Sequence, residues 1–173
     1  FKDIPQNGYI AEYTRRDKLP QVLDFAFQAT VREVLGKGKG TVVLAQLFDG
    51  DVLYEGGEAA ALNLPTFLGN HDMGRFAWLV QQDRKGISQE ELLSRTLLAH
   101  AMLMTLRGAP VIYYGDEQGF VGAGGDQLAR EDMFPSKTAV YNAIDLIGTD
   151  ATTAQANFDT DHPLYRLISE MAK

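Results

Sequence analysis

The chain has 173 residues, of which 45% are hydrophobic and 23% charged, so it has the composition of an ordinary single globular domain with enough apolar residues for a core. Its formal charge of −7 and isoelectric point near 4.9 argue against nucleic acid and anionic membranes as partners, because both require a basic surface. The absence of cysteine excludes disulfides and cysteine-ligated zinc but leaves the cellular compartment open. No apolar run approaches the roughly 20 residues of a membrane-spanning helix, and the start at Phe1 rather than Met suggests a processed or excised piece.

The first part of the chain is predicted to contain a loop, a strand and two helices. Residues 1–20 carry prolines and an Asn-Gly pair, which are typical of loops and turns. Residues 22–27 are apolar except for Asp24 and indicate a buried strand, in which Asp24 is either a satisfied structural group or part of a site. The structural role is favoured, because unpaired buried acids are rare. A short helix is predicted over residues 29–35 and a longer one over residues 41–54.

A short apolar strand at residues 66–68 is followed by three consecutive polar side chains, Asn70, His71 and Asp72. A buried strand that ends in clustered polar groups is how α/β folds place a site at the carboxyl edge of a parallel sheet. Asn and Asp after a strand can also simply cap the next helix. His71 favours a functional site, because capping gives no reason for an imidazole at that position.

The best-marked helix of the chain follows a shorter one. Residues 75–82 predict one or two helical turns. Ser88 and Glu91 then form a capping box, and an apolar stripe over residues 92–106 predicts a helix with one face in the core. The pair Arg107-Gly108 would provide a cation and a left-handed cap at its carboxyl end.

The last part of the chain is predicted to contain a strand, a loop and two helices. Residues 109–114 indicate a fully buried strand that ends in glycine and two acids at 115–117. The glycine-rich residues 119–126 predict a mobile loop. Helices are expected over residues 138–147 and 163–171, the second of them amphipathic.

The alternation of strands and helices predicts the fold class. Three short apolar strands separated by helical stretches imply parallel β/α units with right-handed crossovers. Two of the strands end in polar clusters, which would lie at the same edge of the sheet. This arrangement suits a doubly wound sheet or an arc of a (β/α)₈ barrel, and a complete barrel needs about 250 residues.

Two motifs narrow this choice. Residues 67–72 (FLGNHD), followed by residues 108–117 (GAPVIYYGDE), resemble the α-amylase family of glycoside hydrolases, glycoside hydrolase family 13. Upstream, residues 19–25 are similar to the segment that leads into and forms the sixth barrel strand of that family, and residues 162–165 resemble the start of its last barrel helix. The resemblance covers residues 13–173.

The resemblance implies an α/β fold, a partial (β/α)₈ TIM barrel with about the last three β/α units, strands 6, 7 and 8. Residues 1–173 would then be the C-terminal part of an α-amylase-type catalytic barrel, with no second domain.

The resemblance also implies roles for the central polar residues. Asp72 matches the family's catalytic aspartate that is not the nucleophile and that grips sugar hydroxyls while the oxocarbenium-like transition state forms. His71 matches a histidine that donates to the same sugar, and Asn70 and Arg75 are expected to be substrate-binding as well. Arg75 could alternatively pair with a carboxylate or lie on the surface of its helix.

Two essential groups are not found in this sequence. Retaining hydrolysis needs a nucleophile and a general acid about 5 Å apart, and the family's nucleophile lies in a Gly-Phe-Arg-x-Asp context that does not occur here. The local acids Asp24, Asp49, Asp116 and Glu117 match neither group. We therefore expect a fragment of a retaining α-amylase-type glycosidase, acting on α-glucosidic bonds of starch-like glucans and inactive alone. A non-catalytic structural or sugar-binding subdomain is the alternative. A small doubly wound binding protein is disfavoured, because no phosphate-binding loop follows the first strand.

The expected partners follow from this interpretation. They are an α-glucan or oligosaccharide and, because a partial barrel leaves strand edges open, the missing N-terminal part of the barrel or a second copy. Calcium is common in the family, but its usual ligands would lie upstream, so no cofactor and no metal site are predicted in this fragment. A secreted or periplasmic location is slightly favoured over a cytoplasmic one. Hydrolase, transglycosylase and isomerase activities stay open.

Overall fold

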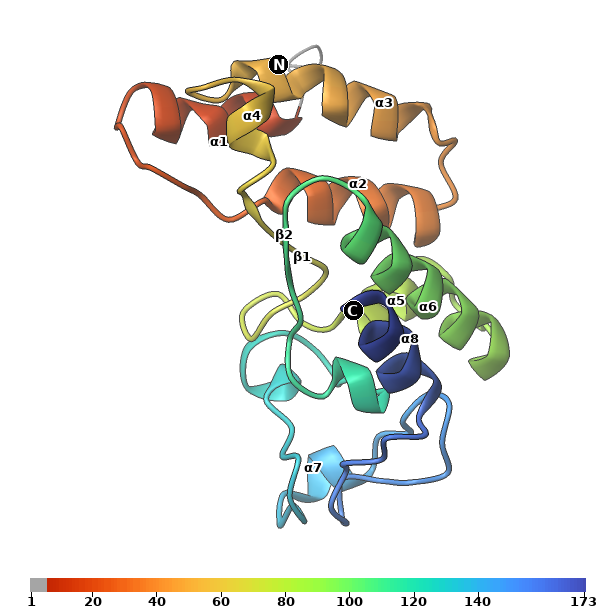
Figure 1. Ribbon diagram of the computed structural model, residues 1–173. Coiled ribbons are helices and arrows are strands. Elements are labelled where there is room, and N and C mark those ends of the chain that lie inside the picture. The colour runs from red at the N-terminus through yellow and green to blue at the C-terminus, as the bar shows by residue number, and fades with distance from the viewer. Residues whose placement is uncertain (1–5) are drawn as a thin grey trace.

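The computed structural model describes residues 6–173 (Figure 1). Three segments η1, η2 and η3 are short 3₁₀ helices. In chain order the elements are α1 (Gln6–Arg15), α2 (Phe25–Leu35), α3 (Val42–Asp49), η1 (Gly50–Leu53), α4 (Glu58–Ala61), β1 (Pro65–Phe67), α5 (Phe76–Asp83), α6 (Gln89–Thr105), β2 (Ala109–Val111), η2 (Asp116–Gln118), η3 (Asp126–Ala129), α7 (Ala139–Asn142) and α8 (Pro163–Met171).

Within the described residues, the sheet consists of β1 and β2, which pair in parallel (Figure 1). Pro65 lies opposite Ala109 and Phe67 opposite Val111, and the connection between the strands runs through α5 and α6. The parallel β/α arrangement is thus confirmed for these two strands. The prediction that residues 109–114 form a fully buried strand is wrong: β2 is shorter and exposed, because no described segment pairs with its other edge.

The predicted strand over residues 22–27 is also wrong, because α2 begins inside it. The Asp24 carboxylate caps this helix by accepting a hydrogen bond from the Phe27 backbone N–H at 2.9 Å. The apolar run is therefore divided between a non-helical entry and the first helical turn. Asp24 still donates its backbone N–H to the Pro65 carbonyl at 3.0 Å, so the entry lies beside β1 without forming a ladder.

The predicted loop over residues 1–20 is wrong for residues 6–15, which form α1, and is confirmed for residues 16–20; its first five residues lie outside the described part. The Asn-Gly pair lies inside this helix and is held by a tertiary contact. The buried Asn7 amide donates to the Leu47 carbonyl at 2.8 Å and to Asp51 Oδ1 at 3.3 Å. These contacts override the local turn preference.

The well-marked helix is confirmed as α6. Ser88 Oγ accepts a hydrogen bond from the Glu91 backbone N–H at 3.1 Å, as an N-cap should. The Glu91 side chain does not complete the capping box but bonds Arg95 Nε at 2.9 Å, one turn further on. Arg107 does not act as a helix-end cation either, because its guanidinium binds the carboxylates of Asp24 and Asp51.

The remaining helix predictions had mixed outcomes. The helices predicted over residues 29–35, 41–54, 75–82 and 163–171 are confirmed, the second as α3 followed by η1. The helix predicted over residues 138–147 is limited to the four residues of α7.

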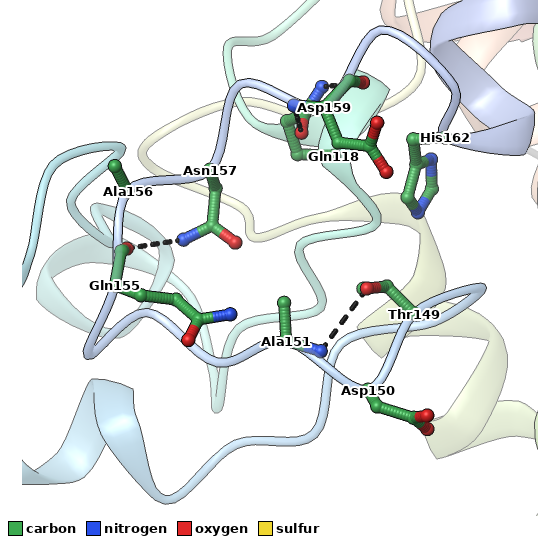
Figure 2. Close-up of a pocket in the computed structure, with 9 residues that line it drawn as sticks. All are labelled: Gln118, Thr149, Asp150, Ala151, Gln155, Ala156, Asn157, Asp159 and His162. Atoms are coloured by element: carbon green, nitrogen blue, oxygen red, sulfur yellow. Dashed lines mark hydrogen bonds between the residues drawn. The ribbon is translucent and has the colours of Figure 1, made fainter.

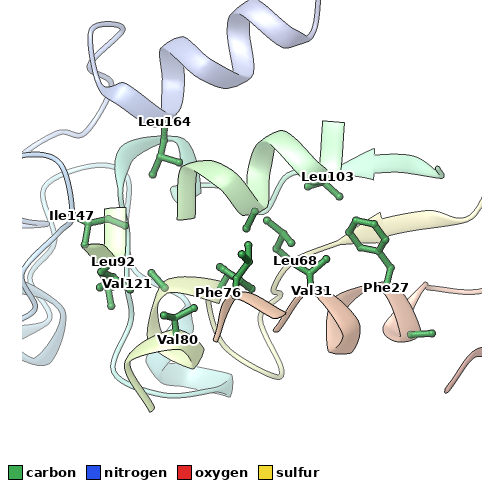
Figure 3. Close-up of a cluster of buried hydrophobic side chains, with 14 of the residues drawn as sticks. Phe27, Val31, Leu68, Phe76, Val80, Leu92, Leu103, Val121, Ile147 and Leu164 are labelled. Atoms are coloured by element: carbon green, nitrogen blue, oxygen red, sulfur yellow. The ribbon is translucent and has the colours of Figure 1, made fainter. Parts of the chain in front are cut away.

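The main hydrophobic core lies where α2, α5, α6 and α8 meet (Figure 3). Its buried side chains come from these four helices, from α3, from the residue after β1 and from two loops; those labelled in Figure 3 are Phe27, Val31, Leu68, Phe76, Val80, Leu92, Leu103, Val121, Ile147 and Leu164. A smaller cluster of Ala11, Tyr54, Ala61 and Leu64 joins α1 and α4 to the entry of β1. The core thus fixes the start and the end of β1.

Candidate functional site

The three polar residues after β1 lie on a closed loop. Asn70 and Gly74 exchange backbone hydrogen bonds of 3.2 and 3.1 Å, and Asn70 Oδ1 accepts from the backbone N–H groups of Asp72 and Met73 at 2.9 and 3.0 Å. The Asn70 side chain therefore fixes the turn itself. It does not cap α5, which starts later and has Arg75 as an N-cap residue without a capping side-chain bond.

His71 and Asp72 project from this loop into solvent, with 56% and 74% of their side chains exposed. His71 Nε2 lies 3.3 Å from Asp72 Oδ1, so the imidazole and the carboxylate are neighbours at the carboxyl end of β1. Both side chains are free to contact a ligand. The predicted grouping of Asn70, His71 and Asp72 is present in the structure, with Asn70 holding the turn on which the other two lie.

Arg130, a residue that sequence reasoning missed, completes the exposed cluster. Its Nη2 lies 3.7 Å from Asp72 Oδ1 and 2.7 Å from Asp126 Oδ1. No local signal identifies Asp126 or Arg130, because they lie at the end of the glycine-rich segment and just after it, in a stretch that resembles an ordinary loop. Only the tertiary fold brings them to Asp72.

The glycine-rich segment packs directly against the Asn70–Gly74 loop. The Asp126 backbone N–H donates to the Asp72 carbonyl at 3.1 Å. A Cβ on Gly125 would lie 2.5 Å from that same carbonyl oxygen, so only glycine allows this approach. Phe120 and Val121 of the same segment are buried, so this predicted mobile loop is partly anchored in the core.

Arg75 lies beneath the exposed cluster and is fully buried. Its Nη1 donates to Asp116 Oδ1 at 2.9 Å and to the Tyr114 carbonyl at 2.7 Å, and its Nε donates to Glu131 Oε2 at 2.8 Å. Burial lowers the pKa of Arg75, but the charges of Asp116 and Glu131 outweigh this and raise it above the ordinary value. Arg75 thus pairs with carboxylates, as one sequence interpretation held, and does not reach the solvent where a sugar would lie.

His100 lies on the far side of Asp116. Its ring is buried on α6, with Nδ1 2.9 Å from the Thr96 carbonyl and Nε2 3.7 Å from Asp116 Oδ2. Asp116 is therefore placed between a guanidinium and an imidazole. This group of charged residues ties the end of the β2 segment to the start of α5.

The exposed cluster has the chemistry of a hydroxyl-binding surface. A carboxylate accepts hydrogen bonds, whereas an imidazole and a guanidinium can donate them. Among residues 6–173 there is no group of three or more histidine and acidic side chains placed to hold a metal ion. No helix of the described chain is both long and apolar enough to cross a membrane.

The fold is similar to that of solved α-amylase-type structures. The chain superposes on an Anoxybacillus α-amylase with a TM-score of 0.65, at 24% identity, covering 96% of this chain and 30% of that one. A cyclomaltodextrin glucanotransferase, CldA, gives a TM-score of 0.60 at 29% identity and covers 97% of this chain and 27% of its own.

Curated sequences show the same relationship. An α-amylase from Streptomyces lividans is 47% identical over 163 residues, which are 94% of this chain and 18% of the relative. A cyclomaltodextrin glucanotransferase from Bacillus sp. (strain 1-1) is 31% identical over 88% of this chain and 20% of its own. The chain therefore spans about a fifth of the length of these relatives. The family model described as "Alpha amylase, catalytic domain" matches residues 4–163, and the chain belongs to this α-amylase catalytic-domain family.

Proposed function

We propose that this chain forms part of the catalytic barrel of a retaining α-amylase-type glycosidase and that its Asn70–Gly74 loop contacts the glucan at the cleavage position. The observation that carries this proposal is the exposed His71–Asp72 pair on a turn fixed by Asn70 at the carboxyl end of β1. Family membership and the identity to the Streptomyces α-amylase support it.

We assign the chain to the last three β/α units of the barrel. In this assignment β1 and β2 are strands 7 and 8, and residues 22–24 take the place of strand 6. The hydrogen bond from the Asp24 backbone to the Pro65 carbonyl supports the last point, since it lies on the edge of β1 where a preceding strand would pair.

The exposed pair can act on the sugar without forming a covalent bond to it. The Asp72 carboxylate would accept hydrogen bonds from ring hydroxyls and stabilise the positive charge that develops at the anomeric carbon. His71 would donate to a hydroxyl of the same ring. Arg130 Nη2, 3.7 Å from Asp72 Oδ1, places a positive charge beside this carboxylate.

Cleavage requires two further carboxyl groups, a nucleophile and a general acid about 5 Å apart. Asp116 is buried and bound to Arg75, and Asp24 is buried and bound to Arg107, so neither can serve as a free nucleophile. For the isolated 173-residue chain the proposal is therefore sugar binding without cleavage. The proposed substrate class is an uncharged α-glucan, because a protein with a net charge of −7 does not repel a neutral ligand.

The proposal is tested by titrating the isotope-labelled chain with maltotriose and following backbone amide signals by NMR. We expect saturable shifts at His71, Asp72 and Arg130. Asp72→Asn should weaken this binding by at least about tenfold, because a hydrogen bond to a charged group contributes about 1.5–3 kcal/mol.

The control is Asp17→Asn, which changes an exposed carboxylate beyond α1 and should leave the affinity unchanged. Absence of any shift in the Asn70–Gly74 loop, or equal affinities for the two variants, would refute the assignment of Asp72.

A further inference from the structure

A second polar pocket lies between η2 and the segment that precedes α8 (Figure 2). It encloses about 490 Å³, within the range of small-ligand sites. Its lining shares no residue with the Asn70–Gly74 loop and consists of Gln118, Thr149, Asp150, Ala151, Gln155, Ala156, Asn157, Asp159 and His162.

The wall formed by η2 is fixed by a reciprocal pair of hydrogen bonds. The buried Gln118 amide donates to the Asp159 carbonyl at 3.0 Å and accepts from the Asp159 backbone N–H at 2.7 Å. This pairing anchors the segment before α8. The Asp159 carboxylate lies beside His162 at the rim of the pocket, and its Oδ1 accepts a hydrogen bond from the Asp161 backbone N–H at 2.8 Å (Figure 2).

The His162 ring is also fixed by two hydrogen bonds to the backbone. Its Nδ1 accepts from the Leu164 backbone N–H at 3.2 Å, so its Nε2 carries the proton that it donates to the Ile147 carbonyl at 2.9 Å. The buried imidazole is therefore a fixed wall of the pocket.

The opposite wall presents the side-chain amides of Asn157 and Gln155. Asn157 Nδ2 donates to the carbonyls of Gln155 and Thr152 at 2.8 and 3.2 Å, which turns Asn157 Oδ1 toward the open space (Figure 2). The Gln155 amide points into the same space, and within the described part of the chain it has no hydrogen-bond partner. Ala151 and Ala156 add small apolar surfaces between these groups.

This lining selects the chemical class of the ligand. It contains two carboxylates and no lysine or arginine, which disfavours an anion. Asp150 points away from the other lining residues, and one oxygen of Asp159 accepts from the Asp161 backbone N–H, so a metal ion would lack ligands (Figure 2). Amide donors and acceptors beside a carboxylate match a neutral compound with many hydroxyl groups.

We propose that this pocket binds a neutral, hydroxyl-rich ligand, a short oligosaccharide, as a second site separate from the Asn70–Gly74 loop. The fixed walls make the site pre-organised, so binding needs little reordering of the protein. The proposal does not depend on Asp72.

The test follows the side-chain amide signals of Asn157 and Gln155 by NMR while the labelled 173-residue chain is titrated with maltotriose, and separately with CaCl₂. We expect saturable shifts with maltotriose and none with CaCl₂. Gln155→Ala and Asp159→Asn should each weaken the binding about fivefold, the effect of losing one hydrogen bond. Asn at position 159 can still accept the bond that the Asp161 backbone N–H makes to Asp159 Oδ1, so this variant keeps the local fold.

Two controls separate this site from the first. Gln21→Ala removes an exposed glutamine outside the pocket and should not change the affinity. Asp72→Asn should leave the shifts of Asn157 and Gln155 intact even where it abolishes those of the Asn70–Gly74 loop. No shift at the two amides, a response to CaCl₂ instead of maltotriose, or unchanged affinity in both pocket variants would overturn the proposal.

Discussion

Arg75 is a buried residue that joins three segments of the chain beneath the exposed His71–Asp72 pair. Its guanidinium joins the start of α5 to Asp116 after β2 and to Glu131 beyond η3, and the rings of Tyr113 and Phe120 lie within 4.6 and 5.1 Å of it. Buried charges of this kind are stable only when each is paired. Arg75 thereby holds the Asn70–Gly74 loop against the segment that runs from Asp116 to Glu131 and includes Arg130.

We predict that Arg75→Met destabilises the chain by about 3–5 kcal/mol, because it leaves Asp116 and Glu131 buried without a counter-ion. Urea unfolding followed by circular dichroism measures this loss. Arg166→Met, which removes an exposed ion pair with Asp161, is the matched control and should change the midpoint little. Similar midpoints for the two variants would contradict the role assigned to Arg75.

Glu33 gives a second prediction at this scale, on the pH dependence of stability. Hydrogen bonds from Lys37 and Lys39 lower the pKa of Glu33 below its ordinary value of 4.5. The unfolded chain then binds this proton more readily than the folded one, so the stability that Glu33 contributes is complete above pH 4.5 and is lost as the pH falls through the lower folded value. Glu33→Gln should therefore flatten the acid limb of the stability profile. An acid limb identical to that of the wild-type chain would show that the ion pairs contribute nothing.

At the scale of elements, the sequence predicted the helices and strands whose ends are determined by neighbouring residues. Ser88 starts α6 as its capping pattern indicates, and the residues before Asn70 form a strand. The pattern over residues 22–27 failed because apolar content does not distinguish a buried strand from the first turn of a buried helix, and the Asp24 cap favoured the helix. The helical state of Asn7 was not predicted, because the residues that its side chain contacts, Leu47 and Asp51, are forty or more positions away in the sequence.

Substitution of Gly108 tests whether β1 and the chain entering β2 must pack in close contact. It has a φ of +111°, and a Cβ there would lie 2.3 Å from Thr66 Cγ2 in β1. Gly108→Ala should cost at least about 1–3 kcal/mol from backbone strain alone, and the clash adds to this. Gly40→Ala, at a position with open space and without a positive φ, is the control. Equal thermal midpoints for the two variants would rule out a close-packed β1–β2 entry.

At the scale of the whole molecule, the exposed strand β2 explains what the sequence could and could not predict. The α/β class and the parallel pairing were predictable from the alternation of strands and helices along the sequence. The Asn70–Asp72 cluster was predictable because its polar residues directly follow an apolar strand. The contact of Arg130 with Asp72 and the burial of Arg75 depend on packing between distant segments. The exposure of Val111 follows from the lack of a described neighbour for β2, which composition does not reveal.

We expect this open edge to make the isolated chain self-associate. Leu23, Phe25, Val111 and Tyr114 are each 42–50% exposed on or near the sheet. Sedimentation velocity should show concentration-dependent association, which Val111→Lys should weaken, because a charged edge blocks strand pairing. Val52→Lys, at a more exposed site on η1 (60% against 45% for Val111), should leave the association unchanged. A strictly monomeric wild-type chain would count against an open barrel edge.

The central claim is that Asp72 and His71 form the sugar-contacting part of a catalytic site whose nucleophile and general acid are not supplied by these residues. The most direct measurement is the release of reducing sugar from soluble starch by the purified 173-residue chain. The account predicts no release above the background of the Asp72→Asn variant. Measurable release that Asp72→Asn abolishes would contradict it.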